Sequence, residues 1–276
     1  MLDLHNHTTY SDGTLSPADL VQEAITAGVK ALAITDHDTL AGWDEAIAAA
    51  GKALEIVPGV ELSTTDNGRS LHVLGFYPNR EALNPALQDR LTVRRERAAA
   101  MVERLAALGY PITLPAMEAN RAPGRPHLAA AMVAAGYAES MNEVFDRWLG
   151  DRGPAYVPYA EFSAAEGIRL LRNCGAVPVW AHPYLFRGGT VETVLPRLVD
   201  AGLMGIEVYH PSHSPSDVRR LEEWCQHYGL IQTGGSDYHG PSPDPTRAKS
   251  QTRLNQLQLP MALLEPLHWA KASLRN

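Results

Sequence analysis

The chain begins with the stretch Leu2-Asp3-Leu4-His5-Asn6-His7, in which apolar residues lead into two histidines. This pattern predicts a short β-strand whose end carries polar side chains. A helix is expected next, because Ser16 is a suitable N-cap and Pro17 stands at the first helical position. A second apolar run over 30–35 then ends in Asp36-His37-Asp38. Strand, helix and strand in this order indicate a parallel βα unit.

Apolar β-branched runs and amphipathic stretches alternate along most of the rest of the chain. Further strands are predicted over 54–61, 71–77, 177–181, 205–209 and 230–234, and further helices over 40–50, 164–173, 191–201 and 216–228. The chain has 276 residues, 45% of them hydrophobic, which is enough for one large core. We therefore expect an α/β barrel.

The stretch 79–162 breaks this alternation, because it shows helical patterns and no strand pattern. A long helix is predicted over 91–108, and shorter ones over 126–135 and 140–149. We interpret 79–162 as an all-helical insertion, a lid that contributes substrate contacts, and 1–78 with 163–276 as the barrel.

The composition of the chain limits the kinds of molecule that we expect it to bind. The formal net charge of −7 argues against binding of duplex DNA, but a small anionic substrate held by a few local cations is compatible with it. Only two cysteines, Cys174 and Cys225, are present, which fits a reducing cytosol. No apolar run is long enough to span a bilayer. We expect a cytoplasmic protein without an obligate protein partner.

Polar side chains recur where the predicted strands end. Because the C-terminal ends of parallel barrel strands meet at one face, these side chains should converge. Seven of the eleven histidines belong to this strand-end set. The candidate metal ligands are His5, His7, Asp12, His37, Glu61, His72, His182, Asp237 and His239, and His210 lies at a further strand end.

Each of these elements is weak evidence by itself, since a lone His-x-His pair or strand-end carboxylate is usually structural. Together, imidazoles and carboxylates without a thiolate indicate a multinuclear metal site. Nine ligands exceed the need of one tetrahedral ion and suit two or three, with Glu61 as a bridge. A structural role would not explain the cost of burying so many ionisable groups.

Five motifs resemble those of the PHP (polymerase and histidinol phosphatase) domain family. They are Asp3-Leu4-His5-Asn6-His7-Thr8 with Ser11-Asp12-Gly13-Thr14, Thr35-Asp36-His37-Asp38-Thr39, Pro58-Gly59-Val60-Glu61 with His72, Ala181-His182-Pro183, and Gly235-Ser236-Asp237-Tyr238-His239. The resemblance implies a distorted, TIM-like (βα)7 barrel that holds up to three ions.

By this resemblance, the three metal sites share Glu61. The first would use His5, His7, Glu61 and Asp237; the second Glu61, His72 and His182; the third Asp12, His37 and His239. Manganese, zinc and iron all occur in the family, and a shell without cysteine suits Mn²⁺ best. The expected reaction is direct attack of a metal-bridging hydroxide on a phosphate monoester. Asp237 and His210 are the candidates to protonate the leaving group.

Substrate contacts are expected from the insertion. Arg125 and His127 flank the first turn of a predicted helix, where backbone N–H groups attract phosphate and arginine adds a bidentate grip. Arg94 and Arg97 are further candidates, although the default interpretation of their helix face is a solvated one. His210 is either a phosphate contact or a support for the ligands.

The run Gly124-Arg125-Pro126-His127 resembles one PHP branch, whose members remove the 3′-phosphate of nucleoside 3′,5′-bisphosphates (pAp to AMP) or trim short 5′-phosphorylated RNA. Three alternatives stay open: a histidinol-phosphate phosphatase or other small phosphomonoesterase, an amidohydrolase that cleaves C–N bonds, and a non-catalytic polymerase-associated module. The complete ligand set disfavours the third alternative, and the additional Asp12, His37 and His239 disfavour the second.

Overall fold

The computed structural model describes residues 1–114, 123–158, 161–241 and 252–274. One seven-stranded sheet dominates it, with the strands in chain order. The strands are β1 (Leu2–Asp3), β2 (Ala31–Ile34), β3 (Glu55–Asp66), β4 (Arg69–Phe76), β5 (Val177–Trp180), β6 (Gly205–Tyr209) and β7 (Ile231–Gly234). Backbone hydrogen bonds join the two ends of the sheet: Leu4 N donates to Gly234 O at 3.2 Å, and His7 N donates to Tyr238 O at 2.9 Å. The predicted α/β barrel is confirmed.

Strand β4 runs antiparallel to both of its neighbours, whereas the other pairings are parallel. The reason is the tight turn between β3 and β4, where Asn67 and Gly68 both have positive φ, 49° and 68°. Two such residues form the hairpin turn that asparagine followed by glycine favours. Strand β3 consequently runs on to Asp66, and the expectation that Glu61 ends its strand is wrong.

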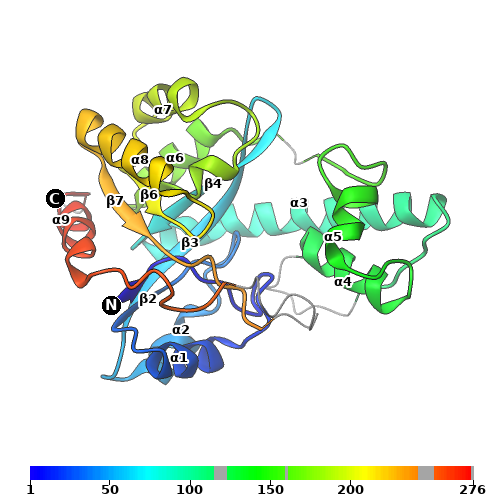
Figure 1. Ribbon diagram of the computed structural model, residues 1–276, viewed down its shortest axis with the longest axis horizontal. Helices are drawn as coiled ribbons and strands as arrows, with labels where there is room; N and C mark the ends of the chain where they lie inside the picture. The colour runs from blue at the N-terminus through cyan, green and yellow to red at the C-terminus, as the bar shows by residue number, and fades with distance from the viewer. Residues whose placement is uncertain (115–122, 159–160, 242–251, 275–276) are drawn as a thin grey trace.

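Helices cover the outside of the barrel (Figure 1). They are α1 (Pro17–Thr26), α2 (Trp43–Ala50), α6 (Ala164–Asn173), α7 (Val191–Asp200) and α8 (Pro215–Tyr228), while α9 (Glu265–Leu274) lies at the end of the barrel away from the insertion. The predicted N-cap is in place, since the Ser16 side chain accepts a hydrogen bond from Asp19 N. None of the helices in the described ranges is both long and apolar enough to cross a membrane.

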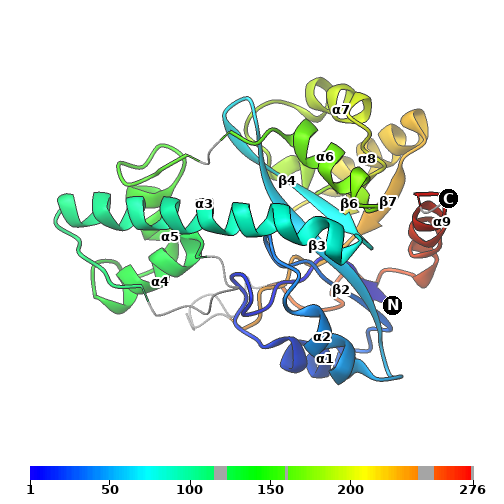
Figure 2. The same cartoon turned by 180° about the vertical axis from the view of Figure 1, so that it is seen from behind.

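The insertion is carried on one long helix, α3 (Arg80–Ala107), which runs from the barrel into a separate helical unit (Figures 1 and 2). This helix begins at Arg80 rather than at Leu91, because Asn79 caps it and Leu83 and Leu87 pack into the barrel core. Farther along, α3 packs against α4 (Arg125–Ala134), α5 (Met141–Val144) and the π-helical turn η1 (Phe145–Leu149) around a core of their own. The insertion therefore projects from the barrel on an element rooted in it.

Candidate active site

Glu61 lies at the centre of the predicted ligand set. It is on β3 and only 1% exposed. Its Oε2 lies 3.2 Å from a ring nitrogen of each of three histidines, and its Oε1 lies 2.8 and 3.0 Å from two more. In that order these are His5, His7, His37, His72 and His182. One carboxylate therefore touches imidazoles that follow or lie on β1, β2, β4 and β5.

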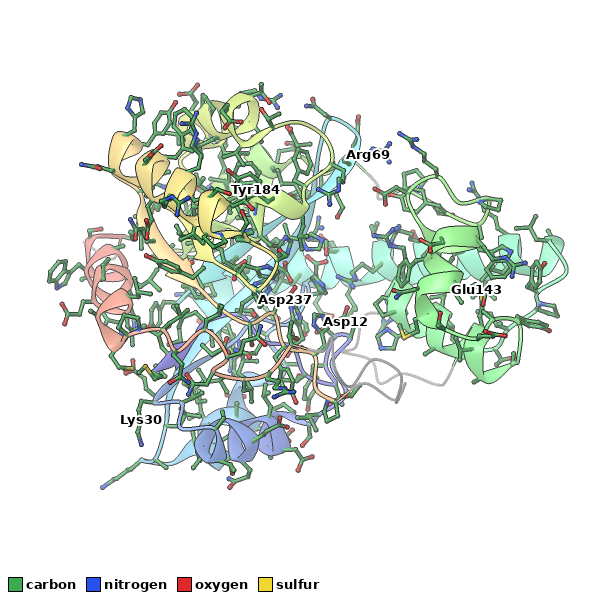
Figure 3. The ribbon with its side chains drawn as sticks, viewed as in Figure 1. Asp12, Lys30, Arg69, Glu143, Tyr184 and Asp237 are labelled. Carbon is green, nitrogen blue, oxygen red and sulfur yellow. The ribbon has the colours of Figure 1, made fainter. Side chains whose placement is uncertain are left out.

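The other two carboxylates flank this centre. Asp12 Oδ1 lies 3.3 Å from His239 Nε2 and 3.6 Å from His7 Nδ1. Asp237 Oδ1 lies 3.2 Å from His7 Nε2 and 3.5 Å from His5 Nε2. Figure 3 places Asp12 and Asp237 on the side of the barrel that faces the insertion, with Lys30 on the other side. All nine predicted ligands thus come together at one end of the barrel.

Groups of these ligand atoms are close enough to hold ions. Four sets have all their ligand atoms within 4.8 Å of one another: His7, Asp12, His37 and His239; His5, His7 and Glu61; His5, His182 and Asp237; and His37, Glu61 and His72. The sets overlap, and they divide the nine residues differently from the family pattern. Asp237 groups with His182 rather than with Glu61, and His72 groups with His37.

The buried atoms in this cluster fit a metal. His5 Nε2, His7 Nε2, His37 Nδ1 and Asp12 Oδ1 are buried, and within the described ranges none of their close polar contacts has hydrogen-bond geometry. Such atoms are costly unless something else binds them. Imidazole and carboxylate donors around one buried point are the ligands that borderline divalent cations take in proteins.

The charges in the cluster depend on one another. Burial raises the pKa of Glu61, but His37 and His5 outweigh it and hold that pKa well below its usual range. Burial lowers the pKa of His37 to about 3. Burial also lowers the pKa of His7, but the carboxylates of Asp237 and Glu61 outweigh it and raise that pKa to about 10. A metal ion at His7 would compete with a proton for the ring nitrogen.

One buried carboxylate outside the predicted ligand set, Glu207, orients the ring of His5. Glu207 on β6 is fully buried, its Oε1 lies 2.9 Å from His5 Nδ1, and its Oε2 accepts from His182 N at 2.7 Å. Because Glu207 contacts Nδ1 of His5, Nε2 of the same ring faces the cluster. Glu207 was not predicted from the sequence, although an acidic residue inside a buried strand was a usable signal.

A second buried network ties the insertion to the ligand His37. The next residue, Asp38, accepts from Arg90 Nε at 3.1 Å and from Arg94 Nη1 at 2.8 Å, and Ser63 N donates to it at 3.0 Å. Because Arg90 and Arg94 belong to α3, the long helix is fixed directly against the loop that carries His37. The interpretation of Arg94 and Arg97 as a solvated face is wrong, since they are 4% and 6% exposed.

The predicted substrate residues fall in different places. Arg125 lines a pocket of about 510 Å³ together with six of the predicted ligands and two further arginines, Arg69 and Arg187. His127 does not line this pocket, and its Nδ1 accepts the Gly124 N–H at 3.1 Å at the start of α4. Arg94 faces Asp38 and Ser63. Arg97 donates to Val157 O at 2.7 Å.

His210 is buried directly behind Asp237. Its Nδ1 accepts the Ser212 N–H at 3.2 Å, and its Nε2 lies 3.6 Å from Asp237 Oδ2. Burial raises the pKa of Asp237, but His5 and His210 are among the neighbours that outweigh it and keep that pKa well below its usual range. Asp237 is therefore a carboxylate at neutral pH, a state suited to metal binding.

A buried cluster of imidazoles and carboxylates, at one end of a βα barrel and open to an arginine-lined pocket, defines a metal-dependent hydrolase of anionic substrates. The family model described as the PHP domain matches residues 3–141. The chain belongs to the PHP domain family, and the predicted class, a metal-dependent phosphoesterase, is confirmed.

Similar proteins cover nearly the whole chain. A 5′-3′ exoribonuclease of Haemophilus influenzae is 33% identical over 87% of this chain and 90% of its own. A 3′,5′-nucleoside bisphosphate phosphatase of Chromobacterium violaceum is 32% identical over 87% of each. A phosphoribosyl 1,2-cyclic phosphate 1,2-diphosphodiesterase of Eggerthella lenta is 34% identical over 86% of this chain and 94% of its own.

Two solved structures share the fold. A protein described as a metal-dependent phosphoesterase from Bifidobacterium adolescentis has a TM-score of 0.87 and 31% identity, over 98% of this chain and 96% of its own. A protein from Chromobacterium violaceum, named an amidohydrolase and solved with bound sulfate, has a TM-score of 0.83 and 28% identity, over 100% of this chain and 99% of its own.

Proposed function

We propose that this phosphoesterase removes the 3′-phosphate of nucleoside 3′,5′-bisphosphates, converting pAp to AMP. The observation that carries the proposal is the shared pocket, in which Arg125, Arg69 and Arg187 line the same cavity as six proposed metal ligands. A cavity of about 510 Å³ lies within the range of about 300–1,000 Å³ that small-molecule sites take. A substrate with two separated phosphates can use both ends of such a cavity.

The nine ligands would bind two or three divalent ions, for which Mn²⁺ is our first candidate. When bound, these ions would supply an activated water and neutralise the phosphoryl oxygens. The protein holds the ligand rings in place: Glu207 fixes His5, and Asp38 fixes the loop that carries His37. His210 would position the Asp237 carboxylate, which would make its effect on the leaving group an indirect one.

Arg125 would bind the second phosphate. Its guanidinium lies over the faces of Phe145 and Tyr156, at 5.7 and 5.4 Å, so it is packed in place before substrate arrives. A guanidinium fixed in this way can bind phosphate with little loss of side-chain entropy. The bisphosphate phosphatase among the relatives supports this choice of substrate.

Trimming of short 5′-phosphorylated RNA is a second activity of the same site, supported by the relatives named 5′-3′ exoribonucleases. Such a substrate also presents a phosphate at each side of the reacting nucleoside. The two activities therefore need the same two-anion pocket, and substrate length is what separates them.

The test is phosphate release with Mn²⁺ from adenosine 3′,5′-bisphosphate, 3′-AMP, 5′-AMP, histidinol phosphate and a short 5′-phosphorylated RNA. We expect the bisphosphate to have the highest kcat/KM among the nucleotides. Equal kcat/KM values for 3′-AMP and the bisphosphate would exclude a role for the second phosphate. A preference for histidinol phosphate would assign the chain to the alternative phosphomonoesterase.

A further inference from the structure

The arginine-lined wall of the pocket carries a carboxylate between two guanidinium groups. Asp151 follows η1, and its Oδ1 accepts from Arg125 Nη1 at 3.0 Å while its Oδ2 lies 3.3 Å from Arg69 Nη1. The three side chains are between 22% and 31% exposed, so the ion pairs are open to solvent from the pocket. Each oxygen of one carboxylate is used by a different arginine.

This carboxylate connects the two parts of the molecule. Arg69 begins β4 in the barrel hairpin, whereas Arg125 begins α4 in the insertion. Figure 3 shows Arg69 at the edge of the barrel next to the insertion. Among the described residues that line the pocket, Asp151 is the one carboxylate outside the predicted ligand set. The two guanidiniums that an incoming phosphate would meet are thus already bound to an anion of the protein.

We propose that Asp151 is a specificity-determining residue that the remote phosphate of the substrate displaces from Arg125 and Arg69. This inference rests on the proposed function, because it assigns Asp151 a role towards the phosphate that is not hydrolysed. A phosphate monoester carries a charge of about −1.5 to −2 at pH 7 and three acceptor oxygens, so it competes for two guanidiniums better than a carboxylate does. An uncharged hydroxyl at the same place cannot displace Asp151.

If Asp151 is a counter-ion that the substrate displaces, the direction in which its substitution changes substrate binding can be predicted. If Asp151 competes with the substrate, removal of its charge by Asp151→Asn strengthens binding of the bisphosphate. If Asp151 merely holds the arginines in position, the same change weakens binding. Because the pairs are partly exposed, the gain should be modest, about fivefold in KM.

The experiment compares steady-state kinetics of the wild-type protein, Asp151→Asn and Asp146→Asn, all loaded with Mn²⁺, on adenosine 3′,5′-bisphosphate and on 3′-AMP. Asp146 is a matched control, because it lies shortly before Asp151 in the chain, does not line the pocket that holds the predicted ligands and undergoes the same change of charge. Asp151→Ser is the second variant, in case the amide introduces new hydrogen bonds.

We expect Asp151→Asn and Asp151→Ser to lower KM for the bisphosphate about fivefold, with kcat and the KM for 3′-AMP unchanged, and Asp146→Asn to match the wild type. A KM for the bisphosphate that is unchanged or raised in both Asp151 variants overturns the inference, and so does an equal decrease in Asp146→Asn. The proposed function itself fails if the wild-type protein does not hydrolyse the bisphosphate. That result would exclude both the proposed function and the role of Asp151.

Discussion

The ligand cluster of the barrel and the arginine-lined wall of the pocket differ in how their charges are held. In the cluster, Glu61, His5 and His7 are almost fully buried, and the buried Glu207 fixes the orientation of His5. In the wall, Arg69, Arg125 and Asp151 are partly exposed and pair with one another. The cluster is a rigid set of donors around one point, and the wall is a set of exchangeable ion pairs.

This difference suggests that the cluster and the wall have separate functions. Buried donors with fixed geometry suit chemistry, where small displacements of a ligand are costly. Partly exposed ion pairs suit recognition, because exchanging one anion for another costs little. Substitutions in the cluster should therefore reduce kcat or metal content, and substitutions in the wall should change KM. The predictions below test this separation, beginning with the largest effect.

Glu61→Gln should have the largest effect. The change removes the negative charge that five imidazoles share, so both metal content and kcat should fall. We expect kcat to fall by more than ~1,000-fold, because changes in residues that only support metal ligands already cost up to ~100-fold. Metal analysis and phosphate-release kinetics measure the two quantities. The control is Glu55→Gln, at the start of the same strand, where the carboxylate is partly exposed and pairs with His268. Near-normal kcat in Glu61→Gln would show that the cluster is not the reaction centre.

Asp38→Asn tests the connection between the cluster and the insertion. Removing one charge from a buried network of two arginines should lower the free energy of unfolding by about 3 kcal/mol at pH 7. Burial raises the pKa of Asp38, but Arg90 and Arg94 outweigh it and hold that pKa far below its usual range. Urea unfolding of both proteins at several pH values measures the difference.

The pH dependence of that difference has a definite sign. A carboxylate whose pKa is lowered by folding stabilises the protein above its unfolded pKa of about 4, and this stabilisation disappears as the pH falls towards the folded pKa. The gap between the wild type and Asp38→Asn should therefore be widest at neutral pH and should shrink below about pH 4. A gap that stays constant with pH would mean that the ion pairs do not contribute.

Glu207→Gln should have a smaller effect than Glu61→Gln, because Glu207 acts through His5. Metal affinity should fall by ~10–100-fold while the fold stays intact, and excess Mn²⁺ should restore most of the activity. Activity as a function of the Mn²⁺ concentration measures this. Loss of activity that no concentration of metal restores would instead give Glu207 a direct part in the reaction.

Arg125→Gln should have the smallest effect of these variants. The KM for the bisphosphate should rise about tenfold, which corresponds to the low end of the free energy of a hydrogen bond between charged groups. The kcat and the KM for 3′-AMP should stay unchanged. Arg169→Gln on α6, outside the pocket, is the control. A fall in kcat without a change in KM would contradict the assignment of the wall to recognition.

The same contrast explains what could be predicted from the sequence. Histidines and carboxylates that follow the parallel strands converge because those strands present their C-terminal ends at one face. Glu61 and His72 were also named from the sequence, but they join the cluster from within the antiparallel pair of β3 and β4. Glu207 was visible as an acidic residue in an apolar strand, but its contact with His5 joins two strands that are distant in the sequence. The contact of Asp38 with α3 is equally distant, and no local pattern reveals either partner. The hairpin at Asn67-Gly68 was visible, but its effect of extending β3 past Glu61 depends on pairing with β4.

Arginines of the insertion were harder to place. Helical periodicity puts Arg94 and Arg97 on a face of α3, but only tertiary packing decides that Arg94 meets Asp38 of the barrel and Arg97 meets Val157 of the insertion. Arg69 and Asp151 have no motif at all, and they reach the pocket because the hairpin and the insertion lie side by side. The arrangement of the wall therefore could not be obtained from the sequence.

Titration of chelator-treated protein with Mn²⁺, with metal content and phosphate release from adenosine 3′,5′-bisphosphate followed together, tests the central claim most directly. The buried ligand atoms of His5, His7, His37 and Asp12 predict no activity without metal and full activity at two or three bound ions per chain. Full hydrolysis by the metal-free protein, or saturation of activity before a second ion binds, would contradict a multinuclear site.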